Sequence, residues 1–264
     1  MKVPSVVIGQ YIPGDSLLHR LDPRTKILLA LAMVVALFTV ESPWSYLMLA
    51  VLVAAAVLSS RVPVKMVLRG LRPIAFILIL TFVLHLFMDP GEELFTIWRL
   101  RATHEGLRIG LLTVVRLTLL IMATSLVTLT TSPIVFTDGL ERLLNPLRIV
   151  GVPAHELAMM MTIALRFIPT LLEETDKIMK AQMARGADFE SGGLVNRAKS
   201  MIPILVPLFV SAFRRADELA VAMEARCYRG GQGRTRLRQL RFGPADAVVA
   251  AATIVYLAAA VVVR

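Results

Sequence analysis

Five apolar segments place the strongest limit on what this chain can fold into. A helix needs about 20 apolar residues to cross a hydrocarbon core of about 30 Å, and about 17 is the lower limit. One segment reaches that length comfortably, one sits at the limit, and the other three need their flanks to span. Together they predict an all-α polytopic membrane protein with about five transmembrane helices, four or six being the alternatives. The segments are Ile27–Val40, Trp44–Leu58, Ile74–Met88, Ile109–Thr131 and Ala247–Val263.

Composition supports a membrane protein and argues against several other classes. Hydrophobic residues make up 56% of the 264 residues and charged residues 18%, whereas a soluble domain carries about 25% charged residues. The single cysteine, Cys227, excludes a disulfide framework and a cysteine-based metal cluster. The glycine-rich Gly230–Arg234 lacks the Lys-Ser/Thr of a phosphate-binding loop, so no ATPase chemistry is expected. The four histidines are scattered, and His155-Glu156 is not followed by a second His at the zincin spacing, so we expect no metal site and no cofactor. Met1–Gly14 has no apolar core, so we expect no cleaved signal peptide.

The net charge of +10 must lie outside the hydrocarbon. Basic groups precede the first apolar segment, follow the second, and recur in 132–242, which carries 16 Lys and Arg against 11 Asp and Glu. Because short basic loops stay in the cytoplasm, we expect the N-terminus and 132–242 inside and Arg264 outside. Arg226–Arg241, with six Arg and no acid, fits an anionic lipid surface better than nucleic-acid binding. The basic loop residues are Arg20, Arg24, Lys26, Arg61, Lys65, Arg69 and Arg72.

These patterns divide the chain into three parts: residues 1–131 with four spans, 132–242 without a full span, and 243–264 with the last span. The middle part contains a short helical piece, Asp138–Val150, interrupted at Asn145-Pro146. Two longer helices follow, at Ala154–Arg185 and Met201–Tyr228, each with an apolar half too short to span and an amphipathic charged half.

The two longer helices end in matching tripeptides 41 residues apart, Ala184-Arg185-Gly186 and Ala225-Arg226-Cys227. One interpretation is dipole complementarity, since Arg near a helix C-terminus gains about 0.3–1 kcal/mol and Gly is an ordinary residue after the cap. The other is that each Arg fits an acidic groove on a partner, because its fixed fork pairs bidentately with carboxylates. The residues alone leave both interpretations open.

Two further patterns also allow two interpretations. Ala212, Ala216 and Ala220 lie on one helix face and either let a second helix approach closely or only favour helix formation. Arg116 lies inside the fourth apolar segment, where an Arg is either functional or extends to the interface.

The matched ends, the stretch Met223–Arg226 and an N-terminal motif resemble the transmembrane T component of energy-coupling factor (ECF) transporters, the EcfT/CbiQ family. The resemblance covers nearly the whole chain. In this family the second motif ends in Gly, where this chain has Cys227, so that helix end is expected to lack a glycine cap. The N-terminal motif is Gly14-Asp15-Ser16 followed by His19-Arg20-Leu21-Asp22-Pro23-Arg24-Thr25-Lys26, in which Asp22 and Pro23 are also typical of a helix start.

The resemblance implies a non-catalytic scaffold in a prokaryotic cell membrane, with cytoplasmic coupling helices crossing in an X. It implies that the Arg-bearing ends dock into two ABC-type ATPases and that a substrate-binding S component selects a vitamin or metal ion. The piece at Asp138–Val150 would be the first coupling helix, and the two longer helices the second and third.

Two rival functions make different demands on the sequence. A secondary transporter or channel would carry polar groups near the midplane of several spans, and only Arg116 qualifies. A membrane enzyme would need paired carboxylates or a nucleophile with a base, and the sequence offers no such set.

Overall fold

The computed structural model describes residues 11–97, 100–189, 193, 195, 199–230 and 240–263. Contacts divide the chain into two units, one within 9–143 and 238–264 and the other within 1–8 and 144–237. The first is called the membrane unit, and the second, which contains the helices that the family resemblance predicts to be coupling helices, is called the coupling unit.

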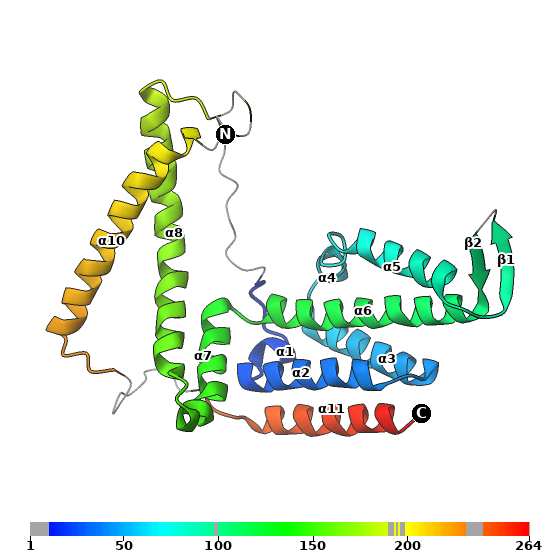
Figure 1. Cartoon of the computed structure of the whole chain (residues 1–264). Coiled ribbons are helices and arrows are strands. Elements are labelled where there is room, and N and C mark those ends of the chain that lie inside the picture. The colour runs from blue at the N-terminus through cyan, green and yellow to red at the C-terminus, as the bar shows by residue number, and fades with distance from the viewer. Residues whose placement is uncertain are drawn as a thin grey trace. The chain divides into compact units, whose positions relative to one another are not determined.

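The membrane unit is a helical bundle with one β-hairpin (Figure 1). All five predicted apolar segments form helices. The strands of the hairpin and the short helices α1 and α4 were not predicted from the sequence. The elements are α1 (Leu17–Arg20), α2 (Pro23–Thr39), α3 (Pro43–Ser60), α4 (Val64–Arg69), α5 (Ala75–Met88), β1 (Glu93–Ile97), β2 (Leu100–Thr103), α6 (His104–Thr130), α7 (Pro133–Leu144) and α11 (Pro244–Val262).

The helix starts follow local capping rules. Asp22 is the N-cap of α2, its carboxylate accepts a hydrogen bond from the Arg24 N–H at 2.9 Å, and Pro23 follows as the first helical residue. Helix α3 also begins with a proline, Pro43, directly after the polar turn that ends α2. The predicted helix start at Asp22-Pro23 is therefore confirmed.

The core of the membrane unit lies among α2, α3, α6 and α11. Leu37 of α2 and Leu49 of α3 are fully buried, and Leu126 of α6 and Leu257 of α11 complete the same cluster. Many outward-facing apolar side chains are exposed, among them Phe38, Leu58 and Val255. An apolar interior combined with an apolar exterior is the pattern of helices that are solvated by lipid.

Four helices of the described chain are long and apolar enough to cross a membrane, which is the lower alternative of the sequence expectation of about five. They are α3, α6, α11 and the coupling-unit helix α8 (Ala154–Ala184). Helix α2 has 17 residues and α5 has 14, so these two predicted spans fall short of that length. Helix α8 meets the criterion, contrary to the expectation that its apolar run does not span, because the helix continues over 31 residues. The polytopic all-α class is confirmed.

Helices α5 and α6 approach each other closely at two glycines of α6. A Cβ on Gly106 would lie 2.4 Å from the carbonyl oxygen of His85, and one on Gly110 would lie 3.2 Å from the His85 Cβ. Gly106 and Gly110 form a G-x-x-x-G pair, which permits close packing of membrane helices. This contact is not among the sequence-based predictions, although the spacing of Gly106 and Gly110 alone could indicate it.

Arg116 of α6 is fixed to the opposite helical hairpin. Its Nε donates to the Tyr46 hydroxyl at 2.8 Å and its Nη2 to the Val40 carbonyl at 3.4 Å, while Tyr46 also donates to Val40 at 3.0 Å. Val40 is the C-cap of α2, where helical carbonyls lack intrahelical partners. Arg116 therefore binds the end of another helix of the same chain.

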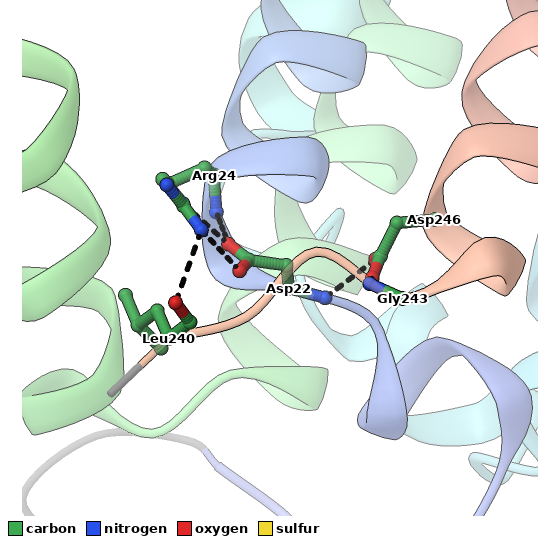
Figure 2. Close-up of polar contacts among 5 residues, drawn as sticks. All are labelled: Asp22, Arg24, Leu240, Gly243 and Asp246. Atoms are coloured by element: carbon green, nitrogen blue, oxygen red, sulfur yellow. Dashed lines mark hydrogen bonds and ion pairs between the residues drawn. The ribbon is translucent and has the colours of Figure 1, made fainter. Parts of the chain in front are cut away.

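A buried polar network joins the starts of α2 and α11 (Figure 2). Asp246 accepts from the Asp22 N–H at 2.7 Å and from the Gly243 N–H at 2.8 Å. Arg24 binds the Asp22 carboxylate through two nitrogens, at 3.0 and 2.9 Å. Burial opposes the charge on Asp22, but hydrogen bonds from the Arg24 side chain and backbone and the charges of Arg24 and Arg142 outweigh it, so the pKa of the Asp22 carboxyl lies below its ordinary value.

The coupling unit contains a 3-10 helix, η1 (Asn145–Val150), and helices α8 and α10 (Ile202–Ala225). The predicted break at Asn145-Pro146 is confirmed, since α7 stops at Leu144 and η1 begins there. Helix α10 crosses α8 near the C-terminal end of α8 (Figure 1). Gln182 of α8 donates to the Pro203 carbonyl at 3.4 Å, and Arg215 of α10 pairs with Glu174 at 3.3 Å.

Replacing Gly106 by Ala is expected to lower the stability of the membrane unit by about 1–3 kcal/mol, because the new methyl group would clash with a backbone carbonyl of α5. Gly110→Ala should cost less, since its nearest neighbours are side-chain and backbone atoms beyond 3 Å. Thermal unfolding in detergent, followed by size-exclusion chromatography, measures both. Leu107→Ala, at an exposed neighbouring position, is the control, and equal unfolding temperatures for all four proteins would contradict the close contact.

Candidate functional site

The candidate site consists of the C-terminal ends of α8 and α10, where the sequence predicts docking residues. At the end of α8, the Ala187 N–H donates to the Gln182 carbonyl and the Gly186 N–H to the Met183 carbonyl, both at 3.0 Å. These two bonds define a Schellman motif, in which a residue of left-handed conformation ends the helix. Gly186 is that residue, with φ of 86°, and Arg185 is the C-cap directly before it.

The end of α10 is built in the same way. The Tyr228 N–H donates to the Met223 carbonyl at 3.0 Å, and the Cys227 N–H to the Glu224 carbonyl at 2.8 Å. Arg226 is the C-cap, and its φ of −89° and ψ of 12° nearly repeat the −90° and 9° of Arg185. The backbone therefore presents the two arginines from equivalent positions of the same motif.

Cys227 occupies the position that Gly186 holds in the first end. Its φ is 55°, in the left-handed region that costs a residue with a Cβ about 1–2 kcal/mol. This helix end lacks a glycine cap, as expected, but it keeps the Schellman motif, because both hydrogen bonds of the motif still form. The helix end keeps its geometry at the expense of local strain.

The residues of both helix ends are not covered by other parts of the described chain. Ala184, Arg185 and Gly186 are exposed, as are Ala225, Arg226 and Cys227. Among the residues that the structure describes, neither arginine has an ion pair or a side-chain hydrogen bond. Both guanidinium groups are therefore available to an acceptor outside this chain.

The two ends differ in their surroundings. An open cleft of about 410 Å³ lies beside Arg226 and is lined by Met159, Met223 and Tyr228 as well as by Arg229. In Figure 1 the C-terminal end of α8 lies beside the start of α10, and the C-terminal end of α10 lies at the opposite end of the helix pair. The arrangement can hold two separate acidic groups, one at each end of the pair.

The predicted packing stripe on α10 is mostly open. Ala212 is half-buried, whereas Ala216 and Ala220 are exposed. The contacts between α8 and α10 given by hydrogen bonds and ion pairs lie instead at Pro203 and Arg215. The role of the stripe in helix packing therefore stays a prediction. In the described part of the chain, no group of three His, Cys, Asp or Glu side chains is placed to hold a metal ion.

Comparison with known proteins identifies the family of this chain. Residues 14–237 match the CbiQ family, described as cobalt transport protein. The chain belongs to the EcfT/CbiQ family. An energy-coupling factor transporter transmembrane protein EcfT of Thermosediminibacter oceani is 61% identical over 248 residues, which is 94% of each chain. EcfT proteins of Ruminiclostridium cellulolyticum and Bacillus subtilis are 54% and 51% identical over 255 residues, each alignment covering 96% or more of both chains.

These findings confirm the family resemblance that the sequence analysis inferred from the matched ends and the N-terminal motif. They also confirm a multi-pass membrane protein with a role in transport. The cleft beside Arg226 could not be predicted from a local sequence pattern, because Met159 lies 64 positions or more from the other lining residues.

Cys227→Gly is expected to stabilise the end of α10 by about 1 kcal/mol, since it removes a Cβ from a left-handed position. Gly186→Ala should destabilise the end of α8 by about the same amount. Hydrogen exchange of the amides of Tyr228 and Ala187, which close the two motifs, measures each effect locally. Cys227→Ala keeps the Cβ and removes only the thiol, so it should behave like the unmodified chain; stabilisation by this control would contradict the argument from strain.

Proposed function

We propose that this chain is the transmembrane scaffold of an ECF-type importer, which transmits ATP-driven motion from two ABC-type ATPases to a substrate-binding S component. The observation that carries the proposal is the pair of equivalent Schellman motifs, each presenting an exposed arginine at one end of the α8–α10 pair. A scaffold between two similar ATPases needs two similar attachment points. Membership of the EcfT/CbiQ family supports the same function.

The docking residues would be Arg185 and Arg226, flanked by Ala184, Gly186, Ala225 and Cys227. Each guanidinium would pair with a carboxylate in a groove of an ATPase, because Arg offers two parallel donors in a fixed geometry. At the second end the cleft lined by Met159, Met223 and Tyr228 would also receive an apolar side chain of the partner. Methionine suits such a surface because its side chain adapts to a partner's shape.

The proposed organisation follows from this role. Residues 132–242 form the coupling region, 1–131 the first membrane part and 243–264 the last membrane helix. The basic loops support a cytoplasmic location of the N-terminus and the coupling region. The exposed small residues Ala216 and Ala220 offer a close approach for a helix of another subunit. ATP is hydrolysed on the partner subunits, and the cargo, a vitamin or a metal ion, is selected by the S component.

The alternative function, a secondary transporter or channel, requires charged groups along a path through the membrane. Arg116 is the intramembrane charge that the sequence offers for that role. Its contacts with Tyr46 and with the Val40 carbonyl give it a structural task at the end of α2. This observation favours the scaffold function over the alternative.

The double variant Arg185→Glu with Arg226→Glu is expected to weaken binding of the ATPase pair at least about 30-fold. Reversal of a charge that pairs across an interface costs 2 kcal/mol or more, and about 1.4 kcal/mol corresponds to a factor of ten. Co-purification of the affinity-tagged ATPases with the chain from detergent-solubilised membranes measures the effect.

The control is Arg148→Glu with Arg214→Glu, which makes the same change in net charge at two other exposed arginines of the coupling unit. It should leave the complex intact. Equal recovery of the ATPases with both double variants would contradict the docking role and, with it, the proposed function.

A further inference from the structure

The coupling region, residues 132–242, begins after α6 and ends before α11, and its first and last residues, 132–143 and 238–242, belong to the membrane unit. Both junctions, and helix α7 between them, contact the same five residues at the start of α2, Asp22–Lys26, which we call the Asp22–Lys26 turn. All these contacts lie within the membrane unit.

The outgoing junction is held by Lys26. Its ammonium group donates to the Thr130 carbonyl at 3.0 Å, to the Thr131 hydroxyl at 3.3 Å and to the His19 carbonyl at 3.4 Å. Thr130 is the last residue of α6 and Thr131 is its C-cap. The side chain is only 7% exposed, so its three protons are directed at protein oxygens that mark the point where the chain leaves the bundle.

Helix α7 contacts the turn through Pro23. A Cβ placed on Gly139 of α7 would lie 2.9 Å from the Pro23 Cβ and 3.1 Å from its Cγ. Glycine at this position therefore permits α7 to lie directly against the proline ring. Thr137, two residues earlier, is buried as well. The first helix after the outgoing junction is in this way packed on the same turn.

The returning junction is held by Asp22 and Arg24 (Figure 2). The Nη2 of Arg24 lies 3.5 Å from the Leu240 carbonyl, and its guanidinium lies 3.8 Å above the Phe242 ring. The Asp22 N–H donates to Asp246 in the first turn of α11. The Asp22 carboxylate, whose side chain is 1% exposed, holds the Arg24 guanidinium in place for these contacts.

We propose that the Asp22–Lys26 turn is the common anchor through which movement of the coupling region reaches the membrane helices. Three separate contacts of one region on one turn mean that a displacement of the region acts on α2, α6 and α11 together. In this arrangement the charged residues of the turn are positioning residues that transmit movement of the coupling region to the membrane helices. They contact neither nucleotide nor cargo. These residues are Asp22, Arg24 and Lys26.

This inference rests on the proposed function, because it takes the coupling region as the part that the ATPases move. It assigns to Arg24 and Lys26 a task beyond marking a helix start and a cytoplasmic boundary. Exposed basic residues would keep this part of the chain on the cytoplasmic side equally well, by the positive-inside rule. Lys26, however, is buried, and the Arg24 side chain is only 16% exposed.

The test uses the double variant Asp22→Asn with Arg24→Met in the complete complex with its ATPases. Asn keeps the N-cap of α2, and removing both charges avoids leaving a buried carboxylate without a partner. The contact of the turn with Leu240 and Phe242 is lost, while the Asp22 N–H still meets Asp246. The control is Asp15→Asn with Arg20→Met, the same pair of changes at two exposed positions shortly before the turn.

The measurement is hydrogen exchange in the first turns of α11, which follow the lost contacts with Leu240 and Phe242, with and without ATP and vanadate. The control and the unmodified chain are expected to show a nucleotide-dependent change in exchange. In the test variant this change should fall at least about fivefold, although ATPase recovery stays within about twofold and hydrolysis continues.

An unchanged nucleotide response in the test variant overturns the proposal. So does a loss of response that only follows a loss of complex, since the turn would then serve stability alone. Absence of any response in the unmodified complex also overturns it. Failure of the proposed function is recognised separately, by ATPases that remain bound when Arg185 and Arg226 are both replaced by Glu. If the double variant proves unstable, Arg24→Lys, which keeps the charge but loses the bidentate geometry, gives the same comparison.

Discussion

The backbone groups at helix ends need partners, and the structure of this chain depends on how they are supplied. The last carbonyls of a helix have no intrahelical donor, and near a hydrocarbon core water cannot replace one. Lys26 meets this need at the end of α6 and Arg116 at the end of α2. At the ends of α8 and α10, where side chains are exposed, Schellman turns do so instead. Side-chain cations therefore bind the terminal carbonyls of α6 and α2, whereas backbone N–H groups bind those of α8 and α10.

The same constraint links stability to the proposed transport role. A buried charge is tolerated only if it is paired or fully hydrogen-bonded, so Lys26 and the Asp22–Arg24 pair must keep their partners for the fold to persist. Those partners lie on segments distant in sequence, which ties several helices to one short turn. At the coupling unit the situation is reversed: the arginines of the two helix ends lack partners within the described chain and remain open to other subunits.

Features set by neighbours along the chain could be predicted from the sequence, and features set by distant residues could not. The helix start at Asp22-Pro23 and the break at Asn145-Pro146 are local, and both are confirmed. The Lys26–Thr130 and Asp22–Asp246 contacts join residues 104 and 224 positions apart, so no local pattern indicates them. The sequence shows that Cys227 replaces a glycine, but only the backbone shows that it adopts the left-handed conformation. The docking role of Arg185 and Arg226 stays a prediction.

The length of α5 has a consequence for the lipid around the protein. Its 14 residues rise only about 21 Å, while the hydrocarbon core of a bilayer is about 30 Å thick. Phe76 near one end and Met88 at the other are both 74% exposed, so this short helix offers apolar contact over its whole length. An apolar helix of this length is matched by local thinning of the bilayer, at a cost of a fraction of a kcal/mol per Å, by flanking side chains that extend to the interface, or by association with another subunit. The last of these would remove the mismatch by displacing the lipid beside α5.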